Sequence, residues 1–186
     1  MKRLVLLILI LLLGIGVSTW ATEKDEPKVP HAGGDVTPAE AYGMLMADPE
    51  HTFLIDCRTM AEYEFVGHPP MAYNIPYNFW TTKGIMKINP NFANDVVEKF
   101  EKTDRLLIIC MSGKRSCLAC NKLAEAGFEH IFNVLGGFEG DKVKDINSTN
   151  YGHLRCINGW QHDGLPYTYE FKEELIYKLY SPCGCE

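Results

Sequence analysis

The sequence predicts an α/β domain built on a central, mainly parallel sheet with helices on both faces. Short apolar runs typical of strands alternate with segments that have helical spacing, as in βαβ folds. The strongest strand signal is Arg105–Cys110, whose apolar run is unbroken, as expected for a parallel strand covered on both faces. Hydrophobic residues make up 46% of the 186 residues, enough for a globular body with its own core.

Local signals mark the individual helices and strands. The first helix is expected after Thr37, where Pro38 suits the first helical position and Glu40 completes a capping box. The other expected elements, in chain order, are a strand over Thr52–Asp56, a helix over Met60–Val66, a strand over Ala72–Pro76, a helix within Asn89–Lys102 with apolar positions at Phe92, Val96, Val97 and Phe100, a helix over Arg115–Ala126 that ends at Gly127, and a strand over Ile131–Gly137.

Residues 1–21 have the layout of a secretory signal peptide. Lys2 and Arg3 precede an apolar run over Leu4–Val17, and small or polar residues follow, with cleavage expected after Ala21. The uncharged run up to Ala21 is also close to the shortest membrane span, so an uncleaved anchor is the alternative. Both interpretations place the domain outside the cytoplasm, either periplasmic or secreted, or tethered to a membrane and facing outward.

The rest of the chain divides into a linker, a domain and a tail. Residues 22–34 are charged and rich in Pro and Gly, which indicates a flexible linker. The domain is expected over 35–168, and 169–186 is expected to hold a helix over Glu170–Tyr180 and a Cys-Gly-Cys tail. The formal net charge of −6 argues against a nucleic-acid partner.

The stretch "CMSGKRS" carries the clearest chemical signal. Cys110 lies at the carboxyl end of the strongest strand, where open α/β sheets bind ligands. Gly113 allows a sharp turn in the loop. A thiolate and a second anion beside it would be favoured by successive backbone N–H groups, by the N-terminus of the next helix, and by Lys114 and Arg115. The pattern therefore favours a nucleophilic Cys110 over a core cysteine.

Three ordered motifs resemble a single-domain rhodanese, the sulfurtransferase module. They are Leu54–Tyr77, with Asp-x-Arg, Glu-Tyr, Gly-His and Ala-x-Asn-Ile-Pro; Arg105–Gly140, with the active-site loop and Gly-Gly; and Asn158–Pro166, with Gly-Trp and Gly-Leu-Pro. The resemblance covers Asp35 to Tyr167. It implies a rhodanese-like fold.

The resemblance also implies a function and a site. Cys110 would take sulfane sulfur from thiosulfate or a persulfide, carry it as a persulfide, and pass it to cyanide or a thiol. The implied donor-binding loop consists of Met111, Ser112, Gly113, Lys114 and Arg115, with no metal and no cofactor. Four residues separate Cys110 from Arg115, one fewer than in phosphatase and arsenate-reductase relatives, which favours sulfur over phosphate. The alternatives are a non-catalytic sulfur carrier, a module that binds an envelope redox protein, and an arsenate reductase or phosphatase.

Four further residues match family positions and are interpreted as supporting the structure. Arg58 and Glu62 lie one helical turn apart and are expected to pair. Asp56 is expected to accept hydrogen bonds from the loop near Cys110, and His68 is assigned a structural role. A direct role in substrate binding is the alternative for Arg58, Glu62 and His68.

The other six cysteines divide into core and loop positions. Cys57 is expected to pack in the core, as are Cys117 and Cys120, whose helical positions share an apolar face. A minority interpretation makes Cys117 a resolving thiol for a Cys110 persulfide. Cys156 falls in the insert Asp141–Asn158, and its pairing with Cys183 or Cys185, or a sulfur-relay role for that terminal pair, stays open.

Overall fold

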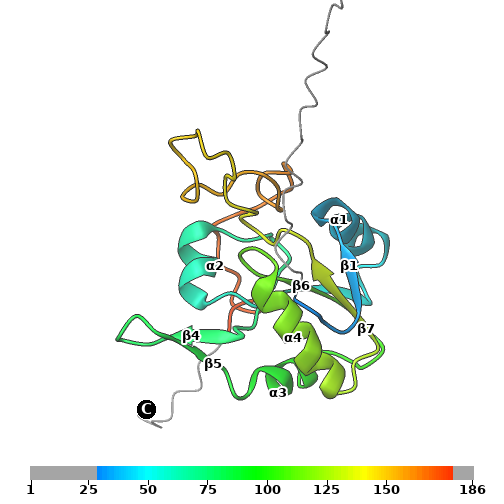
Figure 1. Cartoon of the computed structure of the whole chain (residues 1–186). Helices are drawn as coiled ribbons and strands as arrows, with labels where there is room; N and C mark the ends of the chain where they lie inside the picture. The colour runs from blue at the N-terminus through cyan, green and yellow to red at the C-terminus, as the bar shows by residue number, and fades with distance from the viewer. Residues whose placement is uncertain (1–28, 178–186) are drawn as a thin grey trace, which may run out of the picture.

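A five-stranded sheet forms the centre of the protein (Figure 1). The computed structural model describes residues 29–177. The strands run in the order β1-β7-β6-β2-β3, and every neighbouring pair is parallel. Their bounds are Gly34–Val36 for β1, Thr52–Asp56 for β2, Tyr73–Asn74 for β3, Arg105–Ile109 for β6 and His130–Val134 for β7.

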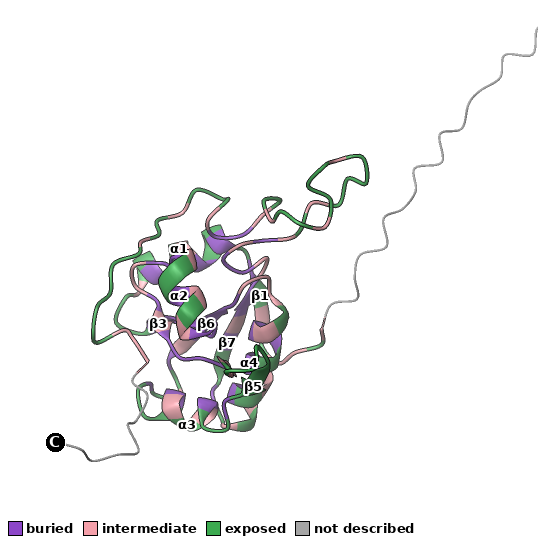
Figure 2. Cartoon of the chain, turned by 90° about the vertical axis from the view of Figure 1, so that its left-hand side faces the viewer, coloured by how far each residue is buried: buried purple, intermediate pink, exposed green. Residues whose placement is uncertain are grey.

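Helices cover both faces of this sheet, so the predicted fold class is confirmed. On one face α1 (Pro38–Ala47) and α2 (Met60–Val66) pack through Ala41, Leu45 and Tyr63. On the other face α3 (Phe92–Val97) and α4 (Lys114–Glu125) pack through an apolar set made of Phe92, Val96, Ala119, Cys120 and Leu123. Figure 2 shows the buried strands at the centre and exposed outer surfaces on the helices.

The central strand β6 explains why its sequence is apolar without interruption. Leu106 and Ile108 point into the core shared with α3 and α4, while Leu107 and Ile109 point into the core shared with α1 and α2. All four side chains are fully buried. Each such burial contributes about 1.5–3 kcal/mol to stability, so both faces of this strand must be apolar.

Capping boxes fix where α1 and α2 begin. The expected box at α1 is confirmed, because the Thr37 side chain accepts from Glu40 N and the Glu40 carboxylate accepts from Thr37 N. A second box, not anticipated from the sequence, joins Thr59 and Glu62 at the start of α2 in the same way. This second box holds the Glu62 carboxylate at the N-terminal end of α2, close to the carboxyl end of β2.

The expected helix within Asn89–Lys102 is shorter than its spacing suggests. It ends at Val97, whose side chain is 41% exposed. Backbone N–H groups of Lys99 and Phe100 both donate to Val96 O, so the chain tightens into a turn. That turn brings the Phe100 ring to 4.9 Å from the Phe53 ring, and this packing replaces a further helical turn.

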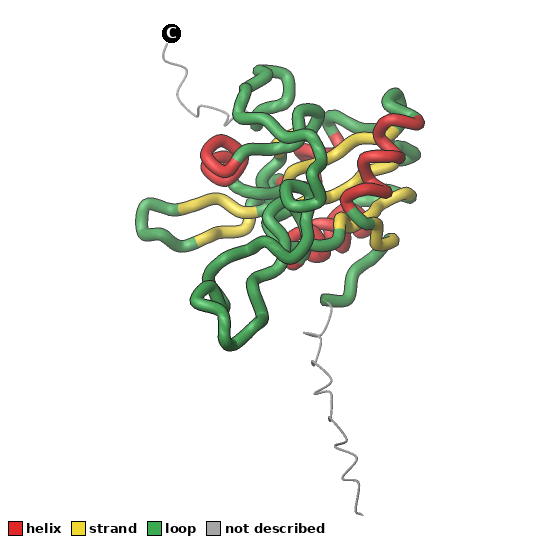
Figure 3. The backbone as a smooth tube through the Cα atoms, turned by 90° about the horizontal axis from the view of Figure 1, so that it is seen from above, coloured by secondary structure: helices red, strands yellow, loops and turns green. Residues whose placement is uncertain are grey.

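A hairpin between β3 and α3 was also not anticipated. Strands β4 (Asn78–Trp80) and β5 (Met86–Ile88) pair antiparallel and project from the body (Figure 3). Its residues are mostly exposed or half-buried, which is why the hairpin lacks the apolar run of a core strand.

The helix expected over Glu170–Tyr180 is wrong for the part that the structure describes. Residues 170–177 form a turn and extended backbone instead. The segment lies along β3, where Asn74 N donates to Leu175 O at 2.8 Å, and Thr168 N donates to His68 O at 2.8 Å just before it. A turn closed by Leu175 N and Lys172 O, and one hydrogen bond to the edge strand, therefore stand in place of a helix.

Several predictions concern residues outside the described range. The signal peptide or anchor over 1–21, the start of the linker and the cysteines of the Cys-Gly-Cys tail all lie outside residues 29–177. Within residues 29–177, no helix is long and apolar enough to cross a membrane.

The paired glycines after β7 hold the loop that carries Cys110. Phe138 N donates to Cys110 O at 2.7 Å, and Glu139 N donates to Met111 O at 3.0 Å. Gly137 has φ +62°, and a Cβ there would lie 2.4 Å from Cys110 O and 2.7 Å from Ser112 N. Only glycine allows this approach without moving the backbone beside the cysteine.

We expect Gly137→Ala to lower the free energy of unfolding by about 1–3 kcal/mol more than Gly127→Ala. Gly127 also has positive φ, +89°, but nothing lies within 4 Å of its Cβ position, so that variant carries only the backbone cost of about 1–2 kcal/mol. Urea unfolding of the two variants measures the difference. Equal losses of stability would contradict the close contact with Cys110.

Candidate active site

Cys110 lies at the base of a pocket at the carboxyl ends of the strands. It directly follows β6 and is 1% exposed. The pocket has a volume of about 1070 Å³. Its walls come from the loop of residues 110–115, from the end of β7 and from the insert of residues 141–158. The predicted donor-binding residues Met111, Ser112, Gly113, Lys114 and Arg115 all line it.

Two hydrogen bonds from the loop and helix reach the cysteine sulfur. Gly113 N donates to Cys110 Sγ at 3.1 Å, and the Ser116 hydroxyl lies 3.3 Å from the same atom. Gly113 precedes α4 with φ +93°, a conformation that turns its N–H back toward the sulfur. The loop thus supplies the predicted backbone donor, and α4 supplies a hydroxyl that the sequence analysis did not include.

Ser116 connects the cysteine to a chain of polar groups behind the site. Its oxygen lies 2.6 Å from Asn133 Oδ1, and Asn133 Nδ2 donates to Asp35 Oδ1 at 2.8 Å. His31 Nε2 lies 3.0 Å from the same Asp35 oxygen. Ser116 and Asn133 are buried, so these bonds satisfy polar groups that would otherwise destabilise the fold. These polar groups have no shared local pattern in the sequence, because they come from three separate segments.

The surroundings of Cys110 favour the thiolate. Burial alone raises the pKa of its thiol, but the neighbouring Cys57 and Ser116 side chains and the positive charge of Arg115 outweigh it and lower the pKa to about 5. A thiolate is the nucleophilic form of cysteine, so Cys110 is reactive at neutral pH. The site can therefore attack an electrophilic sulfur without a separate general base.

Arg115 pairs with Glu62, so the expected Arg58–Glu62 pair is wrong. Arg115 Nη1 donates to Glu62 Oε2 at 2.8 Å, and Nη2 donates to Glu62 Oε1, a bidentate arrangement between α4 and α2. Helical spacing does not apply to Arg58, because α2 begins after the N-cap Thr59. Arg115, one of the two predicted cations, therefore lies in the pocket with its guanidinium bound by the Glu62 carboxylate.

Asp56 binds Arg58 instead of the loop near Cys110, which corrects the second expectation. Asp56 accepts from Arg58 N at 3.0 Å and from Arg58 Nη2 at 2.6 Å, and both side chains are fully buried. Arg58 also donates to Gly67 O at 2.7 Å and packs over the Phe138 ring at 4.3 Å. Because Arg58 follows Asp56 by only two residues, its long side chain folds back and donates to the Asp56 carboxylate. This supports the structural role assigned to both residues.

His68 has the geometry of a structural residue. It is buried, its Nδ1 lies 3.0 Å from Tyr63 O, and its Nε2 lies 3.2 Å from Glu170 O. The ring stacks on Tyr63 with centroids 3.5 Å apart. Burial lowers its pKa, and the neutral ring has one N–H, so it donates to one of these two carbonyl oxygens.

Cys57 is buried in the core as expected, but it also touches the reactive cysteine. The two cysteines follow neighbouring strands and belong to the same core cluster. Burial, followed by the interaction with Cys110, raises the pKa of Cys57 well above its usual value, so Cys57 stays a thiol beside Cys110. The available signal was positional, since each cysteine directly follows a strand of the same parallel sheet.

The other described cysteines occupy different surroundings. Cys120 is fully buried in the core shared with α3 and α4, and Cys117 is buried and also lines the Cys110 pocket. Cys156 is exposed in the insert. Within residues 29–177, no group of three or more His, Cys, Asp or Glu side chains is placed to hold a metal ion.

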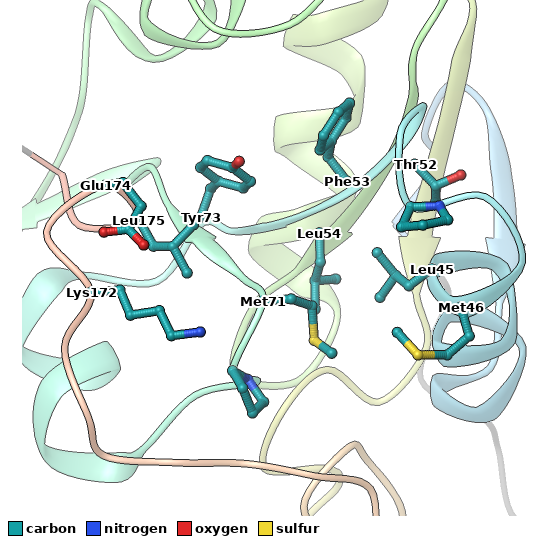
Figure 4. A pocket seen from close by; sticks show the side chains of 12 residues that line it. Leu45, Met46, Thr52, Phe53, Leu54, Met71, Tyr73, Lys172, Glu174 and Leu175 are labelled. Atoms are coloured by element: carbon teal, nitrogen blue, oxygen red, sulfur yellow. The ribbon is translucent and has the colours of Figure 1, made fainter.

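A second pocket lies far from this chemistry. Figure 4 shows it between α1, the start of β2 and the C-terminal segment, with Leu45, Met71 and Tyr73 among its mostly apolar lining. It contains no nucleophilic cysteine and lies toward the amino end of β2. The Cys110 pocket is therefore the candidate active site.

The fold and site define a class: an α/β protein with a cysteine thiolate in a glycine-containing loop at the end of a parallel strand. The sequence profile described as "Rhodanese-like domain" matches residues 37–144, more than half of the chain. The chain therefore belongs to the rhodanese-like domain family, and the predicted family is confirmed.

Individual relatives agree with this assignment. The chain is 39% identical over 84 residues to senescence-associated protein DIN1 of Raphanus sativus, covering 45% of each chain. It is 34% identical over 114 residues to thiosulfate sulfurtransferase 16, chloroplastic, of Arabidopsis thaliana, covering 61% of this chain and 88% of that one. The match thus spans less than half the length of the first relative.

A solved structure extends the similarity to the fold. The crystal structure of Rv0390 from M. tuberculosis has a TM-score of 0.61 and 30% sequence identity, covering 76% of this chain and 100% of that chain. This similarity supports the parallel sheet and its helical layers as a family fold.

We expect alkylation of Cys110 by iodoacetamide to keep its rate from pH 8 down to about pH 6 and to lose it as the pH falls through about 5. The alkylation rate falls at low pH because protonation below the pKa of Cys110 removes the thiolate. Ser116→Ala removes one donor to the thiolate and is expected to raise the midpoint by about one pH unit. Peptide-resolved mass spectrometry measures the rates, with the exposed Cys156 as an internal reference. A wild-type midpoint near 8.5, the value of an ordinary thiol, would contradict the assigned thiolate.

Proposed function

We propose that this protein is a sulfurtransferase that takes sulfane sulfur from thiosulfate or a persulfide and passes it to cyanide or a thiol. The observation that carries the proposal is the Cys110 sulfur, held by Gly113 N–H and Ser116 hydroxyl donors at the base of an open pocket. Membership of the rhodanese-like family and the similarity to a relative named as a thiosulfate sulfurtransferase support it.

The first half-reaction transfers one sulfur atom to Cys110. The thiolate attacks the outer sulfur of thiosulfate, the sulfur–sulfur bond of the donor breaks, and its electron pair leaves with sulfite. The product is a Cys110 persulfide, whose outer sulfur extends into the pocket. Gly113 N–H, which donates to Cys110 Sγ, lies close to the negative charge on that sulfur.

The second half-reaction returns the cysteine to its starting state. A nucleophile such as cyanide attacks the outer sulfur, the bond to Cys110 Sγ breaks, and the electron pair returns to the thiolate. The low pKa of Cys110 makes it a good leaving group in this step. The same property therefore serves both halves of the cycle.

The charge of the pocket supports an anionic donor. The protein has a formal net charge of −6, yet five basic side chains line this pocket against two acidic ones. The basic ones are Lys114, Arg115, Lys142, Lys144 and Arg155, and the acidic ones are Asp35 and Asp141. Since Glu62 neutralises Arg115, the insert supplies much of the remaining positive charge.

We also propose that the protein acts outside the cytoplasm, in the periplasm or beyond, either after removal of residues 1–21 or held by them. The support is the basic start and apolar run of that segment. Fractionation of cells and intact mass of the purified protein test both forms, and a full-length cytoplasmic protein would contradict the proposal.

We expect Cys110→Ser to abolish formation of thiocyanate from thiosulfate and cyanide, because the hydroxyl cannot carry sulfane sulfur. Intact mass after incubation with thiosulfate should show one added sulfur atom on wild type and none on the variant. Cys156→Ser, which changes an exposed cysteine in the insert, is the matched control and should keep the activity. Activity on arsenate or an aryl phosphate, with none on thiosulfate, would contradict the proposed function.

We expect Lys142→Gln to raise the KM for thiosulfate about 2- to 5-fold and to change kcat little, because an exposed charge assists binding more than reaction. The effect should shrink at high salt. Lys83→Gln removes the same charge from an exposed turn of the β4–β5 hairpin and should leave KM unchanged. Steady-state kinetics at two ionic strengths measure these values, and equal effects of the two substitutions would exclude a role for the insert.

A further inference from the structure

Cys57 and Cys110 occupy equivalent positions on two neighbouring parallel strands. Strand β2 pairs with β6 so that Asp56 lies opposite Ile109, and the next residue on each strand is a cysteine. Cys57 N donates to Ile109 O at 2.9 Å, so the pairing continues to the two cysteines. Both side chains belong to the core cluster on the α3 and α4 side of the sheet.

This register places the Cα atoms of the two cysteines within the range that a disulfide spans. Neighbouring strands are about 4.8 Å apart, and disulfides join residues whose Cα atoms are about 4.4–6.8 Å apart. Both side chains belong to the same buried cluster, so they leave the sheet on the same face. A bond between them therefore needs no rearrangement of the strands.

The two cysteines differ in what can reach them. Cys110 lines the pocket, so a sulfur donor approaches it from there. Cys57 is fully buried, so it meets Cys110 only from within the core. An outer sulfur added to Cys110 would extend into the pocket, away from the buried flank that Cys57 occupies. Cys57 can thus reach Cys110 Sγ more directly than it can reach the outer sulfur.

We propose that Cys57 is a resolving residue that converts the Cys110 persulfide into a Cys57–Cys110 disulfide and releases sulfide. The step rests on the proposed function, since it begins from the persulfide. Cys57 Sγ attacks Cys110 Sγ, the bond from Cys110 Sγ to the outer sulfur breaks, and its electron pair leaves with the outer sulfur. The proton of the Cys57 thiol moves to that sulfur, which departs as hydrogen sulfide or hydrosulfide.

The redox balance of this step closes without an added oxidant. The two cysteine sulfurs are oxidised to the disulfide, and the sulfane sulfur is reduced to sulfide. A dithiol reductant then restores both thiols by thiol–disulfide exchange through the pocket. With such a reductant, the protein would turn sulfane sulfur into sulfide with no cyanide or other sulfur acceptor.

The buried position of Cys57 also sets when the step occurs. A buried, protonated thiol is a weak nucleophile, so it does not compete with Cys110 for the donor. It becomes important once the persulfide has formed and no acceptor arrives. Sulfide release should then be slower than transfer to cyanide and should be seen most clearly in the absence of an acceptor.

The test is a single-turnover experiment on protein kept free of reductant. Wild type is loaded with thiosulfate, passed over a desalting column, and followed for released sulfide and for disulfide-linked peptides by mass spectrometry. Loading is repeated with inorganic polysulfide, so that failure of thiosulfate, which counts against the proposed function, still leaves the resolving step measurable. Cys57→Ser is the main variant because serine is close to cysteine in size but cannot form a disulfide.

Two further variants serve as comparisons. Cys120→Ala removes another fully buried thiol of the same core cluster and is expected to behave as wild type. Cys117→Ala tests the other buried thiol that lines the pocket. Circular dichroism checks that each variant is folded, and the wild-type result stands independently of them.

The expected result is that wild type loses its outer sulfur as sulfide and gains a disulfide between the Cys57 and Cys110 peptides. Cys57→Ser should keep the persulfide and release no sulfide, although cyanide still removes its sulfur. The proposal is overturned if wild type keeps the persulfide, if Cys57→Ser releases sulfide at the wild-type rate, if the disulfide joins Cys110 to Cys117, or if neither donor loads Cys110.

Discussion

The in-register pairing of β2 with β6 is the constraint on which the rest of the site depends. It brings the segment after β2 beside the segment after β6, so Cys57 lies next to Cys110. The chain then starts α2 on one face of the sheet and α4 on the other. Glu62 and Arg115 meet over the strand ends and join the two helical layers. A shift of one residue in this pairing would exchange the faces of the side chains and separate all these groups.

The reactive sulfur depends mainly on neutral donors. A hydroxyl and a backbone amide lie within hydrogen-bond distance of Cys110 Sγ, while the Arg115 guanidinium is already bound by Glu62. Such donors are fixed by the fold and need no reorganisation when charge develops on the sulfur. Positive charge in the outer pocket can then attract an anion.

The sequence predicted the elements that have local causes. The capping box at Thr37, the apolar run of β6 and the turn at Gly113 are all encoded within a few residues, and the structure has each of them. The loop of residues 110–115 could be predicted for the same reason. The segment after Glu170 could not, because its contact with β3, through Asn74 N and Leu175 O, overrides its helical spacing.

The parts of the site that were missed depend on contacts between distant segments. Ser116, Asn133 and Asp35 form one polar chain, but their positions in the sequence share no period or spacing. The partner of Arg115 lies 53 residues away. To predict that Cys57 lies beside Cys110, one must know which strands are neighbours in the sheet. The alternation of side chains along a single strand does not give the order of the strands.

The insert of residues 141–158 has a consequence for how this protein can change. It forms one wall of the Cys110 pocket, yet within the described part of the chain it contributes no residue to either core cluster. Substitutions there can alter the shape and charge of the entrance while the packing beneath stays intact. Substrate preference can therefore evolve, or be engineered, separately from folding stability.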